Sequence, residues 1–320
     1  MKNYKVNKNH ILILGITGQD GSLLALNYIN NNKKVFGYLT RKKKNYKNLK
    51  KLKILNKVKL FDGTKNSIEN VISKIKCKYI YFLSGTSSVT TADLFKQEAI
   101  ESNSNLLIKI LEFVRKNKLK SIRILNASSS EIFGQNIQRN SEVSVINPSS
   151  YQGLAKSIST EIARAYRLQF GIKIFNAILF NHESTLRPKD YVIQKIISKA
   201  QDIFLKKTNK ILLGNLDISR DWGWAPEYVE IMKKLINFKN PGDFIVATGV
   251  NEKLRNVVNF IFSYYNLDFK KYVYVSKKFI RKNEILKISA NNTKLVKAIN
   301  YKPKILVKKI ITKMIKKEYQ

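Results

Sequence analysis

Apolar runs and amphipathic segments alternate along the first half of the chain. Short runs rich in β-branched and aromatic residues are typical of buried strands, and they occupy residues 10–14, 34–39, 57–61, 79–83, 121–127 and 173–179. Segments with apolar residues at helical spacing occupy residues 22–31, 67–75, 103–117 and 155–170. This alternation predicts an α/β fold with a doubly wound parallel sheet.

The pattern becomes less regular after about residue 180. Helices are expected at 191–205 and 227–237, with a short apolar piece at 211–213 between them. We therefore predict a larger domain over residues 1–180 and a smaller domain mainly over residues 181–320, from which some strands can return to the first domain. Ligands of such sheets bind at the carboxyl ends of the strands.

A glycine-rich turn directly follows the first expected strand. It reads GITGQDG and places Gly15, Gly18 and Gly21 three residues apart. Glycines let the backbone turn tightly and approach a pyrophosphate, while the next helix offers free N–H groups to that anion. A position between a strand and a helix predicts that this glycine loop binds a dinucleotide.

Residues at the ends of the second and third strands are expected to contact the adenosine half of that cofactor. A carboxylate after the second strand would hydrogen-bond a free ribose hydroxyl, whereas a cation favours a 2′-phosphate. The chain has Thr40, Arg41 and Lys42 there and no acid. We therefore expect NADP rather than NAD, with Arg41 as a contact, and Asp62 is a candidate for the adenine.

The charge of the chain is strongly positive. The sequence has 60 Lys and Arg against 22 Asp and Glu, which gives a net charge of +38. Such a charge suggests that the protein binds nucleic acid. The lysines, however, are spread along the whole chain, as expected for a solvated basic surface. We expect an anionic small molecule as the partner and no nucleic acid.

Composition also bears on metals, disulfides and membranes. Cys77 is the only cysteine, so no intrachain disulfide can form and no metal site is expected. No stretch approaches the roughly 20 apolar residues that a membrane helix requires. The apolar run at 11–16 is too short for a signal sequence, and we expect a cytoplasmic protein.

Four longer motifs carry a family resemblance. In chain order they read GITGQDGS, SSSEIFG, LFNHES and LGNLDISRDWGWAPEYVE. Together they resemble the GDP-mannose 4,6-dehydratase family, over essentially the whole chain. The resemblance implies a Rossmann-like fold of the extended short-chain dehydrogenase/reductase type, NADP as cofactor, a GDP-sugar as substrate, and a homodimer or homotetramer.

The reaction of that family determines which acid–base groups the active site requires. Hydride leaves C4 of the mannose for the nicotinamide, a base removes the C5 proton, water leaves C6, and the hydride returns to C6. Such chemistry requires a base at the C4 hydroxyl and a second acid–base group at C5 and C6. The resemblance implies that Ser129 hydrogen-bonds O4 and that Glu131 is the C5 base.

The resemblance extends to the remaining contacts of the site. It implies that the substrate's diphosphate meets Arg220, because a guanidinium can hold phosphate oxygens through two parallel donors. Two arginines usual in the family are replaced here by Leu186 and Gln194. Further implied cofactor contacts are Thr17, Gln19, Asp20, Leu83, Ser84, Lys156, His182 and Arg187, and further substrate contacts are Ser87, Asn181, Asn215, Arg281 and Glu284.

The stretch PSSYQGLAK departs from the family, whose base is a tyrosine four residues before a lysine. Residues four apart share a helix face, whereas residues five apart point about 140° apart. With Lys156 in register, Gln152 falls on the tyrosine position and Tyr151 lies one residue early. Either Tyr151 is the base, after a looser helix start or a π-bulge absorbs the extra residue, or the base is missing or replaced by another residue.

Three functional hypotheses follow. The first is a GDP-mannose 4,6-dehydratase that forms GDP-4-keto-6-deoxymannose through an internal NADP redox cycle. Its catalytic group would be Ser129, Glu131, Tyr151 and Lys156. The second keeps the scaffold as a GDP-sugar reductase or epimerase, since the fold hosts several chemistries. The third is a catalytically impaired homologue that still binds nucleotide sugars, because glutamine cannot act as the base.

Overall fold

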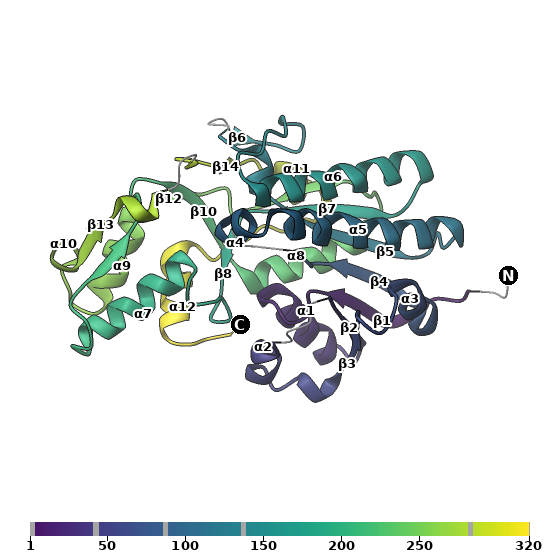
Figure 1. Ribbon diagram of the computed structural model, residues 1–320, viewed down its shortest axis with the longest axis horizontal. Helices are drawn as coiled ribbons and strands as arrows, with labels where there is room; N and C mark the ends of the chain where they lie inside the picture. Colours follow the sequence, from purple (N-terminus) through teal and green to yellow (C-terminus); the bar gives the residue numbers. More distant parts are fainter. Residues whose placement is uncertain (1–3, 41–44, 86–88, 136–138, 281–283, 320) are drawn as a thin grey trace.

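A computed structural model of the chain describes residues 4–40, 45–85, 89–135, 139–280 and 284–319. The chain forms a large lobe around a parallel sheet and a smaller lobe of helices and short strands (Figure 1). None of the helices in these ranges is long and apolar enough to cross a membrane.

The large lobe is organised by a seven-stranded sheet with the order β11-β7-β5-β4-β1-β2-β3. Every neighbouring pair is parallel, and the order steps outward from β1 in both directions. The predicted α/β fold with a doubly wound parallel sheet is therefore confirmed. The strands are β1 (Asn7–Leu14), β2 (Lys34–Leu39), β3 (Val58–Asp62), β4 (Cys77–Phe82), β5 (Arg123–Ser129), β7 (Ile174–Leu179) and β11 (Asp243–Val246).

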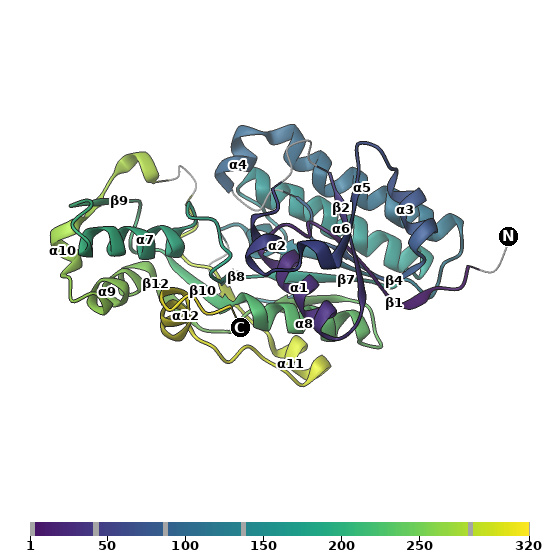
Figure 2. The ribbon, with the colours of Figure 1, turned by 90° about the horizontal axis from the view of Figure 1, so that it is seen from below.

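Helices cover both faces of this sheet (Figures 1 and 2). On one side lie α3 (Ile68–Ile75), α5 (Lys96–Lys116) and α6 (Tyr151–Phe170), and on the other α1 (Gln19–Asn30), α8 (Ala225–Asn237) and α11 (Thr293–Ile299). Successive residues of β1 divide between the two resulting cores, because side chains alternate along a strand: Ile11 and Ile13 in one, Leu12 and Leu14 in the other. This double burial explains why the strands read as continuous apolar runs.

Three helices begin three or more residues earlier than the periodicity indicates. α1 begins at Gln19 instead of residue 22, α5 at Lys96 instead of 103, and α6 at Tyr151 instead of 155. Their first turns are polar or contain glycine, so they lack the apolar spacing by which a helix is predicted. Short elements fill the connections: α2 (Lys47–Lys51), η1 (Leu55–Lys57), α4 (Val89–Leu94), η2 (Ser130–Phe133), and β6 (Arg139–Asn140), which pairs with β14 (Ser289–Ala290).

The small lobe has a core of its own. It is built from α7 (Val192–Phe204), β9 (Ile211–Leu213), β10 (Ser219–Trp224), β12 (Asn251–Lys253), α9 (Leu254–Tyr264), α10 (Phe269–Tyr272), β13 (Val273–Val275), η3 (Lys277–Phe279) and α12 (Val307–Ile315). Trp222 and Trp224 are buried in this core. β10 pairs with β8 (Asn181–Glu183), which follows β7 after one residue, so the large sheet leads directly into the small lobe.

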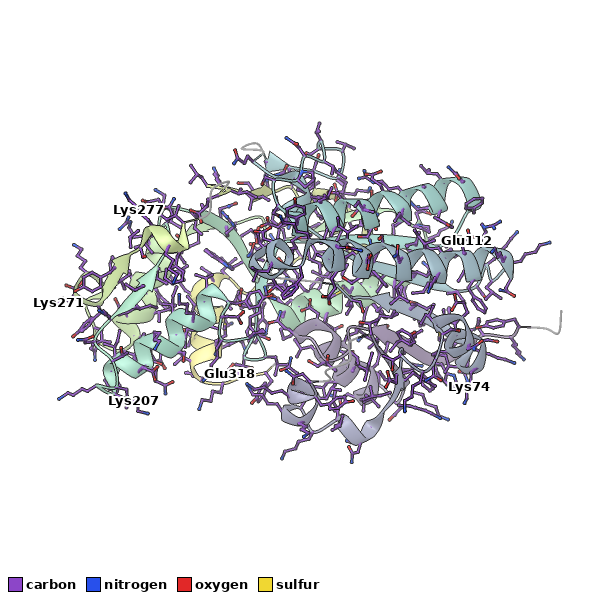
Figure 3. The ribbon with its side chains drawn as sticks, viewed as in Figure 1. Lys74, Glu112, Lys207, Lys271, Lys277 and Glu318 are labelled. Carbon is purple, nitrogen blue, oxygen red and sulfur yellow. The ribbon has the colours of Figure 1, made fainter. Side chains whose placement is uncertain are left out.

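Basic side chains lie on both lobes. Figure 3 labels Lys74 on the large lobe and Lys207, Lys271 and Lys277 on the small lobe, each projecting at the periphery. Their separation agrees with a charge that is dispersed over the surface.

Candidate active site

The glycine loop turns tightly at the carboxyl end of β1. Gly15 has a φ of +84°, and Gly18 N–H donates to the Gly15 carbonyl at 3.0 Å. A Cβ at Gly21 would lie 2.2 Å from the Gly15 carbonyl oxygen, so only glycine fits there. The backbone is thereby free of side chains where a pyrophosphate would approach the start of α1.

Neighbouring segments pack against this loop. A Cβ at Gly15 would come within 2.7 Å of the Leu83 carbonyl oxygen, and Ser84 is adjacent and buried. The Thr17 carbonyl accepts a hydrogen bond from Asn48 Nδ2 at 3.3 Å, which attaches α2 to the loop. Thr17 is part of the glycine loop, and the structure places Leu83 and Ser84 directly against it.

A hydrogen-bond network joins the start of α1 to β8. His182 Nε2 lies 2.9 Å from Asp20 Oδ2, and its Nδ1 lies 2.7 Å from the Phe180 carbonyl oxygen. Gln19 Nε2 donates to the His182 carbonyl at 3.3 Å. Burial opposes ionisation of Asp20, but His182 and Arg187 together hold its pKa below the ordinary value. The predicted cofactor residues Gln19, Asp20 and His182 therefore form one connected group.

Arg187 belongs to the loop that follows β8. Its Nε lies 3.6 Å from Glu183 Oε2, and its guanidinium stacks on the Tyr191 ring at 3.9 Å from the centroid. Burial raises the pKa of the Glu183 carboxyl, and Arg187 partly opposes this. The neighbouring departure from the family, Leu186, is buried and packs in the large-lobe core, so an apolar contact stands where the family has a charge.

Lys156 and Gln152 occupy the buried face of α6. Each is 7 % exposed, and Lys156 Nζ donates to the Ala127 carbonyl at 2.8 Å. Burial lowers the pKa of Lys156 to about 8, and Asp20 lies near enough to oppose this effect. The lysine therefore points toward the sheet and the glycine loop.

Tyr151 is the first residue of α6. Ser150 caps the helix in an extended conformation, and its side chain accepts a hydrogen bond from Gly153 N at 3.1 Å. All 20 residues of α6 are α-helical. The expectation that a looser start or a π-bulge absorbs the extra residue is therefore wrong, and Tyr151 and Lys156 diverge by about 140° around the axis.

A cavity of about 560 Å³ opens beside the start of α6. It brings together Glu131 from η2, Tyr151 from α6 and Arg220 from β10, and so joins the two lobes. The described residues that line it are Val89, Asp93, Glu131, Pro148, Ser149, Ser150, Tyr151, Leu154, Arg220 and Ile285, and this set includes neither Gln152 nor Lys156.

Local contacts fix the carboxylate and the guanidinium of this cavity. Glu131 N–H donates to Ser129 Oγ at 3.3 Å, and Ser150 Oγ lies 3.5 Å from Glu131 Oε2. A Cβ at Gly153 would lie 2.6 Å from the Glu131 carbonyl oxygen, so this glycine lets α6 approach η2. Arg220 is 7 % exposed, and its Nη1 donates to the Ser219 carbonyl at 2.9 Å.

The other predicted substrate residues are more scattered. Asn181 opens β8. Asn215 Oδ1 accepts a hydrogen bond from Asp217 N at 2.8 Å, which is a local turn contact. Glu284 directly precedes Ile285 of the cavity. The structure does not gather these three residues with Glu131 and Tyr151 among the residues that line the cavity.

Asp62 is the last residue of β3. Asp62 Oδ1 accepts hydrogen bonds from Thr64 N at 3.0 Å and Thr64 Oγ1 at 2.8 Å, so it shapes the turn after β3. Arg41, Ser87 and Arg281 lie outside the described residues. Within the described ranges, no group of three or more His, Cys, Asp or Glu is placed to hold a metal ion.

The sequence did not single out several residues of the cavity. Val89 and Asp93 come from α4, a short helix without a periodic pattern, and Leu154 lies one turn after Tyr151. Their participation depends on how α4, α5 and α6 pack together. The spacing of residues within one segment does not predict such packing between helices.

Comparisons with known proteins agree with the motifs. A sequence model of the GDP-mannose 4,6 dehydratase family matches residues 12–314. GDP-mannose 4,6 dehydratase 1 of Arabidopsis thaliana is 29 % identical over 97 % of this chain and 89 % of its own length. GDP-mannose 4,6-dehydratase of Sinorhizobium fredii is 32 % identical over 78 % of this chain and 75 % of its own length.

Solved structures agree on the fold. A dTDP-glucose 4,6-dehydratase from Bacillus anthracis in complex with NAD has a TM-score of 0.82 at 16 % identity and covers 96 % of both chains. A UDP-glucose 4-epimerase from Thermotoga maritima with UDP-glucose has a TM-score of 0.83 at 16 % identity, over 96 % of this chain and 98 % of that one. With motifs, family model and relatives in agreement over most of its length, the chain belongs to the GDP-mannose 4,6-dehydratase family.

Proposed function

We propose that this protein converts GDP-mannose to GDP-4-keto-6-deoxymannose through an internal NADP redox cycle. The observation that carries the proposal is the cavity that Glu131, Tyr151 and Arg220 line together. A carboxylate, a phenol and a guanidinium at one cavity suit a substrate with two sugar protons to transfer and a diphosphate to hold. Family membership supports the same reaction.

The cofactor would lie along the glycine loop. The residues fit a dinucleotide because Cβ atoms at Gly15 and Gly21 would fill the space that the loop keeps open. Bound there, the nicotinamide would accept a hydride and return it. Arg41, which lies outside the described residues, favours NADP, and NAD is the alternative.

The residues divide the proton transfers between them. Tyr151 would take the C4 hydroxyl proton as hydride leaves C4, and Glu131 would take the C5 proton and deliver it to the departing C6 hydroxyl, which leaves as water. When the hydride returns to C6, Tyr151 would give its proton to C5, which completes the 4-keto-6-deoxy sugar and restores the phenolate. Arg220 would hold the diphosphate. Ser129, whose side chain accepts the Glu131 N–H, would keep η2 at the O4 side of the sugar.

Organisation and location follow the family. We assign cofactor binding to residues 1–180 and GDP-sugar binding mainly to residues 181–320. We further propose a homodimer or homotetramer in the cytoplasm, since the family forms such oligomers.

A second candidate is a homologue that binds GDP-mannose without turnover. It is favoured by one observation: Gln152, not a tyrosine, shares the buried face of α6 with Lys156. A glutamine side chain cannot accept and deliver a proton at neutral pH. A reductase or epimerase is the third candidate, and it differs from a dehydratase in needing no C5 base.

The test is an assay of purified protein with GDP-mannose and added NADP. We expect a 4-keto product from the wild type, and a loss of about 10²- to 10⁴-fold in both Glu131→Gln and Tyr151→Phe, as is typical when an acid–base group is removed. Glu98→Gln is the matched control, because Glu98 is exposed on α5 and does not line the cavity.

The alternatives give different results in the same experiment. Binding of GDP-mannose by calorimetry without any 4-keto product would refute the dehydratase and support the impaired homologue. An oxidoreductase or epimerase activity that survives Glu131→Gln would support the third candidate.

A further inference from the structure

Tyr151 and Lys156 lie on different sides of α6, so this lysine is not placed to stabilise the Tyr151 phenolate. Lys156 lies five residues further on a regular helix, is 7 % exposed, and donates to the Ala127 carbonyl. Tyr151 is 38 % exposed and lines the cavity. A phenol is a poor proton acceptor at neutral pH unless a nearby cation favours the phenolate. If Tyr151 acts as a base, another cation has to take this role.

Lys96 is placed to do so. It is the first residue of α5, and its Nζ lies 4.9 Å from the centroid of the Tyr151 ring. An ammonium over an aromatic face is attracted to the ring. Because a phenolate spreads its negative charge onto the ring carbons, the same ammonium stabilises the phenolate more than the neutral phenol.

The other charged groups at the cavity do not supply this interaction. Glu131 from η2 and Asp93 from α4 are acids, and their negative charge disfavours a phenolate. Arg220 from β10 has its guanidinium engaged with the Ser219 and Leu286 carbonyls. Among the described residues that line the cavity or stack on Tyr151, Lys96 is therefore the cation directly against the ring.

We propose that Lys96, and not Lys156, is the positioning residue that stabilises the Tyr151 phenolate. Lys156 lies on the opposite, buried side of α6, which faces the glycine loop. The part of this inference that concerns turnover rests on the proposed dehydratase function, whereas the pairing of Lys96 with Tyr151 does not.

The first experiment needs neither substrate nor cofactor. Tyrosinate absorbance is titrated with pH in the wild type and in Tyr151→Phe, and the difference isolates the ionisation of Tyr151. The same pair is then compared in a Lys96→Met background. We expect the midpoint of Tyr151 to rise at low salt when Lys96 is removed, with a smaller rise at high salt because Lys96 is exposed.

Two further backgrounds sharpen the result. Lys109→Met removes the same charge from an exposed position on α5, more than three turns away, and should leave the Tyr151 midpoint unchanged. Lys156→Met should shift it less than Lys96→Met does. Equal midpoints in the wild-type and Lys96→Met backgrounds, or a larger shift in Lys156→Met, would overturn the proposal.

The second experiment uses turnover. In Lys96→Met the acidic limb of the kcat profile should move to higher pH by the same amount, while KM for GDP-mannose stays within about twofold, and Lys96→Arg should restore the wild-type profile. A large rise in KM with an unmoved profile would make Lys96 a substrate contact and overturn the proposal. If the wild type forms no 4-keto product, the proposed function fails, and the titration still decides the pairing.

Discussion

The glycine loop and the start of α6 both lie at the carboxyl edge of the large sheet, yet they depend on different properties of the sequence. The loop works through its backbone: Gly15 needs a positive φ, and Gly21 needs the space that a Cβ would fill. The start of α6 works through side-chain direction. Each residue turns the helix by about 100°, so a shift of one position moves Tyr151 to a different face.

This difference explains why one region keeps the family pattern and the other does not. A wrong residue in the glycine loop collides with backbone atoms, so the loop has few solutions. A wrong register in α6 collides with nothing: Gln152 is accommodated on the buried face and Tyr151 lines the cavity. The fold therefore constrains the glycine loop directly, whereas only the chemistry constrains the tyrosine.

The largest effect is expected from Gly21→Ala. The added Cβ would lie 2.2 Å from the Gly15 carbonyl oxygen and 2.7 Å from Ile16 Cα, both backbone atoms that cannot swing away. We expect the free energy of unfolding to fall by about 3 kcal/mol. Binding of the nicotinamide cofactor should be lost at the same time, and urea unfolding and calorimetry measure the two effects.

A glycine elsewhere provides the control for that substitution. Gly171 ends α6 with a φ of +64°, and a Cβ there would meet nothing within 4 Å. Gly171→Ala should cost only the backbone strain, about 1 kcal/mol. A Gly21→Ala protein that is as stable as Gly171→Ala would show that the loop is not sterically fixed.

The next effect concerns the buried lysine. Burial lowers the pKa of Lys156 from its ordinary value of 10.5 to about 8, so between these pH values the unfolded chain binds more protons than the folded one. Wild-type stability should therefore rise with pH across that window relative to Lys156→Met, which has no such group. The change in the difference between the two proteins should be about 3 kcal/mol from pH 7 to pH 10.5.

Denaturant unfolding of the cofactor-free proteins at both pH values measures this change. Lys109→Met is the control, since an exposed lysine should give nearly parallel stability curves for variant and wild type. Parallel curves for Lys156→Met as well would mean that the ammonium is solvated, and the division of α6 into a buried and a cavity face would then be untenable.

Much of the fold could be predicted because its signals are local. The six expected strands of the first half are long apolar runs, and all are present. The seventh strand, β11, is only Asp243–Val246, and it pairs with β7 far earlier in the chain, so no local pattern assigns it to the sheet. Short elements such as α4 cannot be predicted from the sequence for the same reason.

The candidate site was predictable to a smaller extent. The glycine loop could be read from spacing because its requirement lies in the backbone of seven residues. The contact of Lys96 with Tyr151 depends on an unpredicted first turn of α5 and on the packing of α5 against α6. Such a contact between residues 55 positions apart follows from tertiary structure alone.

The smallest effect, and the one that separates the two faces of α6 most directly, is expected from Gln152→Leu. Gln152 is buried on the Lys156 side and is not among the described residues of the cavity, so its amide should contribute to packing and hydrogen bonding alone. We expect a loss of about 1 kcal/mol in the free energy of unfolding. The kcat for GDP-mannose should stay within about threefold of the wild type, against the 10²-fold or greater loss expected for Tyr151→Phe. If kcat instead falls in Gln152→Leu as far as it does in Tyr151→Phe, the reacting sugar meets the buried face of the helix. The position in register with Lys156 would then take part in the reaction as well, and the division of α6 into a structural face and a reacting face would be wrong.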